Sequence, residues 1–329
     1  MSWVDGAKFA VGTLSIFRVH VTRVDREVVG QAMTLAPVVG IALGLIAAIP
    51  LLLSPGLLGA VLALAVLAYL TRALHLDGLA DLADGLGSAK PAPQALDIMK
   101  RSDIGPFGVA TLIFTVLAQT AALAGLPPAA SVAALITATL TGRLALTWAC
   151  RSGVPSARPD GLGAMVAGTV RRSTPYLVTL LALAFAALLA VTSVTFLALE
   201  GTTPAVSNPT STAGNPTPAV DGTNPAVGGT NPAVDGPTPA VDGLNPAVGG
   251  PTPVLGGTTP QALTPAALLL PGGLPLVVVL PISVLAGLGA ALLLLRRSVK
   301  RLGGITGDVL GALVETATTA ALITTAVLV

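Results

Sequence analysis

The chain has few charged and few aromatic residues. Only 10% of its 329 residues are Asp, Glu, Lys or Arg, and only 3% are Phe, Trp or Tyr. The net charge of only +2 does not indicate a protein that binds nucleic acid. The single cysteine, Cys150, excludes a disulfide within the chain. A charged fraction this low, beside 53% hydrophobic residues, argues against ordinary soluble domains.

Long apolar runs are present instead. Leu, Ala and Val fill stretches of about twenty residues, the length that a helix needs to cross the hydrocarbon core of a bilayer. We therefore predict an all-α fold, a polytopic integral membrane helical bundle of about seven transmembrane helices in a lipid bilayer. The predicted spans are residues 34–53, 57–74, 107–125, 128–149, 176–199, 274–295 and 308–329.

Basic residues are distributed unevenly between the predicted loops. Fifteen of the 17 Lys and Arg residues fall in segments on one side of the membrane, and the other two lie within spans. Such a bias marks the cytoplasmic side. It places the N-terminus in the cytoplasm and the C-terminus on the other side. The cytoplasmic segments are then residues 1–33, 75–106, 150–175 and 296–307.

Residues 200–272 have a different composition, with a seven-residue repeat of the form "TNPAVGG" or "PTPAVDG". Pro and Gly in every unit exclude a helix, and one Ala-Val pair per unit offers little to bury. We interpret this segment as a disordered Pro/Gly-rich insertion on the non-cytoplasmic side, tolerated between two spans. The predicted organisation is therefore one membrane domain, made of residues 1–199 and 273–329, interrupted by the insertion.

The stretch "LHLDGLADLADGLGS" at 74–88 carries three aspartates, Asp77, Asp81 and Asp84. Their spacing of i, i+4, i+7 places them on one face of a helix, with leucines opposite. A row of like charges is destabilising unless a cation offsets it, and carboxylates that hold Mg²⁺ often face substrate phosphates. The alternative is a solvated acidic face in a cytoplasmic loop.

A second acidic pair, Asp308 and Glu315, is spaced i, i+7 at the start of the last predicted span, after "GGITG". An ionisable residue within a span is expensive and is a functional candidate by default. The alternative for Glu315 is a protonated carboxyl group, or one paired with Arg143.

Several cations on the same side are suited to an anionic substrate. Lys100, Arg101 and Asp103 occur in "MKRSDIGPFG", and Arg158 occurs in "SARPDGLG". Many such residues serve only as topological anchors. Together, the acidic and basic groups predict metal-assisted phosphoryl or phosphodiester transfer at the cytoplasmic face.

The segments "LHLDGLADLADGLGS", "ALDIMKRSDIGPFG", "ARPDGLG" and "GGITGDVLGALVE", in this order, resemble the cobalamin synthase family, adenosylcobinamide-GDP ribazoletransferase. The resemblance covers residues of about 30–200 and 270–329, and leaves out the repeat.

The resemblance implies a transferase of cobalamin (vitamin B12) biosynthesis in the bacterial inner membrane. It implies that adenosylcobinamide-GDP reacts with α-ribazole, or with its 5′-phosphate, to give adenosylcobalamin or its 5′-phosphate and GMP. Mg²⁺ is the implied cofactor, and other cobalamin-assembly enzymes are candidate partners. On this basis the expected site residues fall into three groups: Asp77, Asp81 and Asp84 for metal; Asp84 (as base), Asp81 and Asp308 for catalysis; Lys100, Arg101, Asp103, Arg158 and Glu315 for substrate.

Two other functions compete with this one. A CDP-alcohol phosphotransferase also places aspartates near the cytoplasmic face, but its motif is longer and contains an Ala-Arg pair that "DGLADLADG" lacks. A transporter would place polar groups near the middle of the membrane on broken helices, whereas the acidic groups here cluster toward one face.

Overall fold

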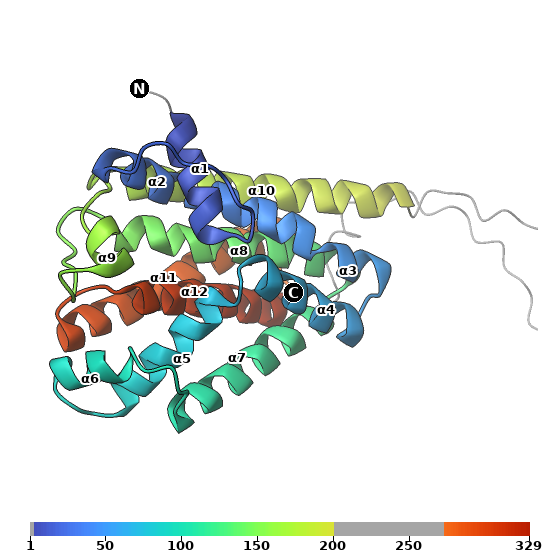
Figure 1. Ribbon diagram of the computed structural model, residues 1–329. Helices are drawn as coiled ribbons and strands as arrows, with labels where there is room; N and C mark the ends of the chain where they lie inside the picture. Colours follow the sequence, from blue (N-terminus) through green and yellow to red (C-terminus); the bar gives the residue numbers. More distant parts are fainter. Residues whose placement is uncertain (1–2, 201–272) are drawn as a thin grey trace, which may run out of the picture. The chain divides into compact units, whose positions relative to one another are not determined.

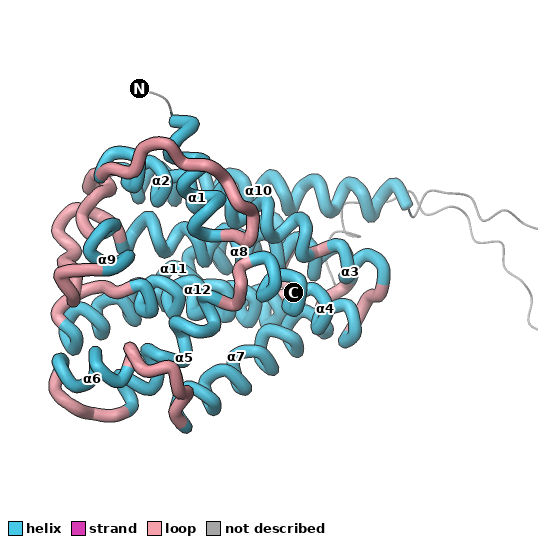
Figure 2. Tube along the Cα trace, viewed as in Figure 1, coloured by secondary structure: helices cyan, strands magenta, loops and turns pink. Residues whose placement is uncertain are grey.

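The computed structural model describes residues 3–200 and 273–329, with side chains described through residue 193 and again from residue 273. Within these ranges the regular secondary structure is helical, with loops between the helices and two isolated β-bridges, which confirms the predicted all-α class (Figures 1 and 2). The helices are α1 (Trp3–Leu14), α2 (Arg26–Ala47), α3 (Ile49–Leu53), α4 (Leu57–Leu70), α5 (Leu74–Gly87), α6 (Ala92–Ile98), α7 (Pro106–Ala124), α8 (Pro128–Ala149), α9 (Gly161–Val166), α10 (Thr174–Glu200), α11 (Leu276–Leu302) and α12 (Gly307–Leu328).

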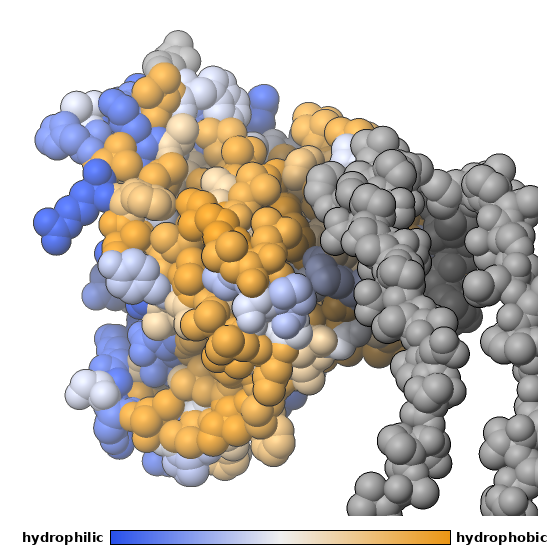
Figure 3. Space-filling model, turned by 90° about the vertical axis from the view of Figure 1, so that its right-hand side faces the viewer, coloured by the Kyte–Doolittle hydropathy of each residue, from blue (hydrophilic) through white to orange (hydrophobic). Residues whose placement is uncertain are grey.

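Six continuous segments are long and apolar enough to cross a membrane: α2 with α3, α7, α8, α10, α11 and α12. They correspond to six of the seven predicted spans. Large apolar side chains lie exposed along several of them, as expected for a surface in contact with lipid, and Figure 3 shows one such hydrophobic face. The chain is therefore a multi-pass membrane protein.

The remaining predicted span, residues 57–74, is not a straight helix. Helix α4 ends after 14 residues and is followed by α5 at an angle of 89°. A helix of that length rises ~21 Å, less than the ~30 Å hydrocarbon core. The break is made by Arg72 and Ala73, whose φ angles of 56° and 53° lie in the left-handed region. Taken together as one broken span, α4 and α5 are long and apolar enough to be the seventh.

Helix α8 is the central element of the bundle. It packs against α2, α10, α11 and α12, and 89% of its apolar window is buried, whereas only 17% of the α10 window is (Figure 1). Its Arg143 is 1% exposed, and the Nε and Nη2 atoms of this side chain have no hydrogen-bond partner among the described residues. Glu315 on α12 lies within electrostatic reach of this guanidinium, but the two side chains form no ion pair.

The predicted insertion, residues 200–272, lies outside the described residues except for Glu200 at the end of α10. Helices α10 and α11, which precede and follow it, pack against each other. The predicted division into one interrupted domain stays a prediction. Most of the longer described loops gather at the end of the bundle that carries α6 and α9 (Figure 2).

Glycines permit the close contact between α2 and α8. A Cβ atom added at Gly40 would lie 2.5 Å from the carbonyl oxygen of Thr139, closer than real Cβ atoms come. Small residues at such crossings let helix backbones approach each other in membranes, where packing rather than the hydrophobic effect drives association. Thr147 adds a hydrogen bond of 2.8 Å from its hydroxyl to the Met33 carbonyl oxygen.

We predict that Gly40→Ala lowers the thermal unfolding midpoint of the purified protein in detergent, because the added methyl group forces α2 away from α8. Gly289→Ala in α11 is the matched control, since nothing lies within 4 Å of a Cβ atom added there. Alanine favours a helix over glycine by ~0.5–1 kcal/mol, so the control should be unchanged or slightly stabilised. Equal midpoints for the two variants would contradict the packing argument.

Candidate active site

Helix α5 carries the three aspartates on one face, as predicted. Asp77 is exposed, Asp81 is half-buried and Asp84 is buried, so the row runs from solvent into the protein. The opposite face supplies Leu79 and Leu82 to the core. The row of carboxylates therefore lies along a packed helix and is not a freely solvated loop.

Asp84 is held by the N-terminus of α7. Its Oδ2 accepts a hydrogen bond of 2.7 Å from the Gly105 N–H, and its Oδ1 accepts one of 2.9 Å from the Gly108 N–H. Free N–H groups and the helix dipole make a helix N-terminus a favourable place for an anion. The glycines are needed because a Cβ at either position would lie 2.5 Å from a carboxylate oxygen. This arrangement makes Asp84 a positioning residue that joins α5 to the "GPFG" segment.

Helix α5 also crosses α12 at very short range. A Cβ added at Gly78 would lie 2.9 Å from the Cα of Asp308, and one added at Gly311 would lie 3.1 Å from the Cα of His75. The crossing places Asp308 beside the α5 aspartates. His75 is buried at this contact and faces the core, consistent with a packing role.

The loop before α12 pairs with the "SARPDGLG" segment. The Ile305 N–H donates to the Pro155 carbonyl oxygen at 2.9 Å, and the Ala157 N–H donates to the Ile305 carbonyl oxygen at 3.0 Å. This pairing brings Arg158 to Asp308, with 3.7 Å between Nη1 and Oδ2. The same guanidinium donates from Nη2 to the Leu96 carbonyl oxygen of α6 at 2.7 Å. All four segments named in the sequence analysis therefore meet around α5 and the start of α12.

A cavity of about 210 Å³ opens beside the aspartates. Two of them, Asp81 and Asp84, line it together with Arg101 and Asp103 from the loop after α6. The structure thus brings four predicted site residues to one cavity. Ser88, Ile98 and Phe107 also line it. These three residues were not predicted from the sequence, and neither were the N–H groups of Gly105 and Gly108. The available signal was Pro106, a residue typical of the first turn of a helix, which begins α7.

Three predicted substrate residues do not line this cavity: Lys100, Arg158 and Glu315. Lys100 is exposed and does not line this cavity. Glu315 lies in a separate, mainly apolar cavity of about 230 Å³ between α4, α7 and α12. It accepts a hydrogen bond of 3.0 Å from Nε2 of Gln119, which also donates to the Thr319 hydroxyl at 2.8 Å. The structure therefore separates Glu315 from the aspartate cavity.

The electrostatics of the aspartate row centre on Asp81, on α5 outside the six continuous spans. Burial, together with repulsion from Asp77, Asp308 and Asp84, raises the pKa of Asp81 to about 7, and Arg158 opposes this shift only partly. Within residues 3–193 and 273–329, no three acidic, histidine or cysteine side chains converge closely enough to hold a metal ion by themselves. The roles assigned to these residues at the sequence level stay predictions.

Comparison with known proteins identifies the family. The model of the family described as cobalamin-5-phosphate synthase matches residues 6–207 and 238–326, most of the chain. The chain belongs to this family. No solved structure matches the chain.

Curated relatives carry a matching name. An adenosylcobinamide-GDP ribazoletransferase of Frankia casuarinae is 48% identical over 178 residues, which are 50% of this chain and 64% of the relative. One from Nocardioides sp. is 41% identical over 172 residues, 50% of this chain and 74% of the relative. One from Stutzerimonas stutzeri is 39% identical over 178 residues, 53% of this chain and 72% of the relative. The chain thus aligns with slightly less than two thirds of the Frankia relative.

For this cobalamin-5-phosphate synthase family member we predict that Asp84→Asn is destabilising. An asparagine offers one acceptor oxygen, so its NH₂ group would face the second backbone N–H of α7. Leaving a buried donor without a partner costs ~1–3 kcal/mol. The unfolding midpoint should fall, whereas Asp97→Asn, at an exposed site on α6, should leave it unchanged. An Asp84→Asn midpoint equal to that of the wild type would exclude the positioning role.

We also predict a pH dependence that belongs to Asp81. The carboxyl group of Asp81 stays protonated in the folded protein up to about pH 7, whereas the ordinary pKa of an aspartate is 3.8. Between these values the folded state binds more protons than the unfolded state, so stability falls as pH rises. Without divalent cations, the unfolding midpoint of the wild type should drop from pH 4 to pH 7 more steeply than that of Asp81→Asn. Parallel curves for the two proteins would contradict this assignment.

Proposed function

We propose that this protein transfers the cobinamide-phosphate moiety of adenosylcobinamide-GDP to α-ribazole, or to α-ribazole 5′-phosphate. The products are adenosylcobalamin, or its 5′-phosphate, and GMP. Family membership and the names of the relatives support the reaction. The observation that carries it in the structure is the meeting of four separate segments at one row of carboxylates beside a cavity.

In the proposed reaction a ribose hydroxyl of α-ribazole other than the 5′-hydroxyl attacks the phosphorus attached to cobinamide, because the 5′ position keeps its phosphate when α-ribazole 5′-phosphate is the acceptor. A new P–O bond forms, the P–O bond to GMP breaks, and the hydroxyl proton must be taken up. Asp81 is the best-placed acceptor, because it lines the cavity and, unlike Asp84, its carboxyl oxygens are not engaged by the backbone N–H groups of α7. Asp84, first considered as the base, has both oxygens engaged by backbone N–H groups.

Arg101 lines the same cavity as Asp81 and is a cation for the diphosphate of the donor. Arg158 holds Asp308 in place through their ion pair and is itself fixed to α6. In this proposal Arg158 orients the carboxylate, and Arg101 contacts substrate. Lys100, exposed outside the cavity, is assigned to the approach of the anionic donor, whereas Asp103 lines the cavity together with Arg101.

Mg²⁺ is part of the proposal. The carboxylates of Asp77, Asp81 and Asp308 repel one another with too little positive charge to offset them, which fits a divalent cation. Mg²⁺ is usually held by one or two carboxylates plus substrate phosphates, so a preformed cluster of three ligands is not required. When bound, the ion would offset negative charge on the diphosphate. Asp84 contributes less directly, because it anchors α7.

We further propose the bacterial inner membrane as the location, with the aspartate cavity and the N-terminus on the cytoplasmic side. The excess of Lys and Arg in the loops around α6, α9 and the α11–α12 turn supports this orientation. Association with other cobalamin-assembly enzymes stays a prediction. The family match favours the ribazoletransferase reaction over a CDP-alcohol phosphotransferase or a transporter.

The decisive experiment supplies the purified protein, in detergent or lipid, with adenosylcobinamide-GDP and α-ribazole and follows GMP release. Release should require Mg²⁺ and should stop when a chelator is added. Asp81→Asn should lower the rate by at least ~100-fold, the usual contribution of a general base. Asp97→Asn, outside the cavity, is the matched control and should keep full activity. Absence of GMP release by folded wild-type protein would overturn the proposed function.

A further inference from the structure

A second cavity, unrelated to the aspartate row, lies between the end of α1 and the α4–α5 turn. Its volume is about 570 Å³, more than twice the 210 Å³ of the cavity beside the aspartates. Residues 12 and 15–20 line it from one side, and Arg72 lines it from the other. The Ile16 N–H donates to the Leu70 carbonyl oxygen at 2.7 Å, which joins these two distant segments.

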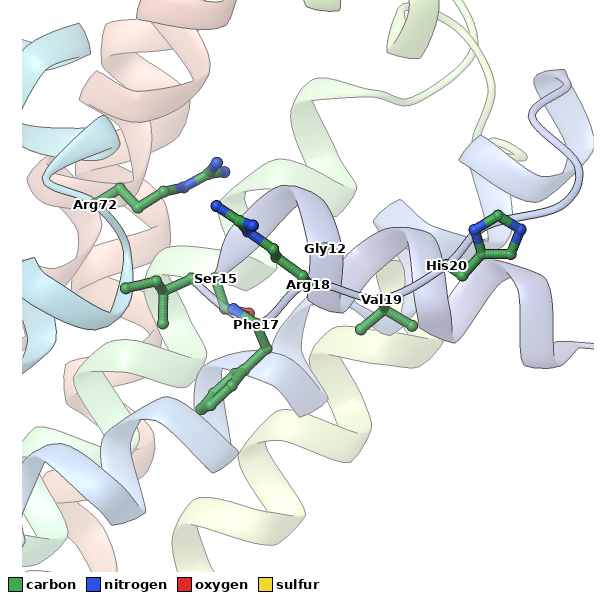
Figure 4. A pocket seen from close by; sticks show the side chains of 8 residues that line it. Gly12, Ser15, Phe17, Arg18, Val19, His20 and Arg72 are labelled. Carbon is green, nitrogen blue, oxygen red and sulfur yellow. The ribbon is translucent and has the colours of Figure 1, made fainter.

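The side chains of this cavity that can carry a charge are all basic. Arg18, His20 and Arg72 line it, and no acidic side chain does. Figure 4 shows the guanidinium groups of Arg18 and Arg72 extending from opposite segments toward each other. Among the described residues, ion pairs to arginine involve only Arg23 and Arg158, so neither of these two guanidiniums is neutralised by the protein. Both arginines are exposed to solvent, so a bound anion can reach two unpaired positive charges at once.

The backbone that presents Arg72 is strained. Arg72 and Ala73 both adopt left-handed conformations that cost non-glycine residues ~1 kcal/mol or more each. The turn persists because it is held by several backbone hydrogen bonds, including one of 2.7 Å from the Ala73 N–H to the Ala68 carbonyl oxygen. Strained non-glycine residues concentrate at functional sites, where surrounding structure holds them in place. Here the strain directs an arginine into the cavity.

We propose that this cavity, which we call the α1–α4 recess, binds a phosphate group through Arg18 and Arg72. Planar guanidinium groups bind phosphate oxygens through paired, charge-assisted hydrogen bonds. The ligand is either the phosphodiester of an anionic phospholipid or a soluble phosphate. The recess is distinct from the aspartate row, and its binding does not depend on the proposed transferase reaction.

The position of the recess favours a lipid headgroup as the source. Two exposed aromatic residues belong to the segments that form the recess. Phe17 lines it and is 48% exposed, and Tyr69, three residues before Arg72, is 69% exposed. Tyrosine and tryptophan are enriched at the membrane–water interface, where phosphate groups also lie. A basic recess at this level is suited to hold one lipid phosphate.

The test measures thermal unfolding of the full chain with a thiol-reactive dye that reports on Cys150. This residue is the single cysteine and is buried, so it reacts when the protein unfolds. One arm compares mixed micelles that contain phosphatidylglycerol with micelles that contain phosphatidylcholine. The other arm compares sodium phosphate with sodium chloride at equal ionic strength in neutral detergent.

We expect the unfolding midpoint of the wild type to be higher in micelles with phosphatidylglycerol than in micelles with phosphatidylcholine. The double variant Arg18→Gln/Arg72→Gln should show little of this rise. Titration of the lipid should show at least ~10-fold weaker binding by that variant, the loss expected for one charge-assisted contact. The matched control is Arg171→Gln/Arg172→Gln, which removes two exposed arginines elsewhere and should keep the full rise. The single variant Arg18→Gln repeats the test if the double variant unfolds during purification.

The two arms distinguish the sources of the phosphate. A rise with phosphatidylglycerol alone identifies a lipid ligand, and a rise with sodium phosphate in neutral detergent identifies a soluble one. The proposal is overturned if neither arm raises the wild-type midpoint. It is also overturned if the recess variants keep the same rise as the wild type, or if the control variant loses it equally, since the effect would then reflect general charge.

Discussion

The close crossing of α5 and α12 is the contact on which the candidate site depends. Gly78 and Gly311 have no side chains, so the backbones of α5 and α12 can approach closely. This contact places Asp308 beside the aspartates of α5. Burial, together with like charges brought close by packing, raises the pKa of Asp81. Arg158 and the N-terminus of α7 offset part of the negative charge from two other segments. This charge distribution is the basis of the proposed Mg²⁺ and diphosphate binding.

Much of this arrangement can be predicted from the sequence, because it depends on local patterns. Runs of apolar residues give six of the spans, and the i, i+4, i+7 spacing of Asp77, Asp81 and Asp84 gives the shared helix face. The bend between α4 and α5 could not be predicted in this way. It depends on left-handed conformations at Arg72 and Ala73, residues whose intrinsic preferences do not indicate such a turn.

The roles of the individual site residues can be distinguished only from their three-dimensional contacts. Asp84 looks equivalent to Asp81 in the sequence, yet the N–H groups of Gly105 and Gly108 occupy its oxygens. Glu315 lies two turns after Asp308 on the same helix, yet it faces a different cavity and Gln119. Both differences arise from residues far away in the sequence. Periodicity reports which face a residue occupies and does not report what packs against that face.

The unpaired Arg143 in α8 has a consequence for biogenesis. An arginine within a membrane-spanning helix is expensive to leave in contact with lipid, by up to ~2.5–3.5 kcal/mol on insertion scales. In the finished bundle Arg143 is 1% exposed, and α8 packs against α11 and α12, which follow it in the chain. When α8 enters the membrane, these two helices have not yet been made. Removal of the Arg143 charge from lipid is therefore a late step in the assembly of the bundle.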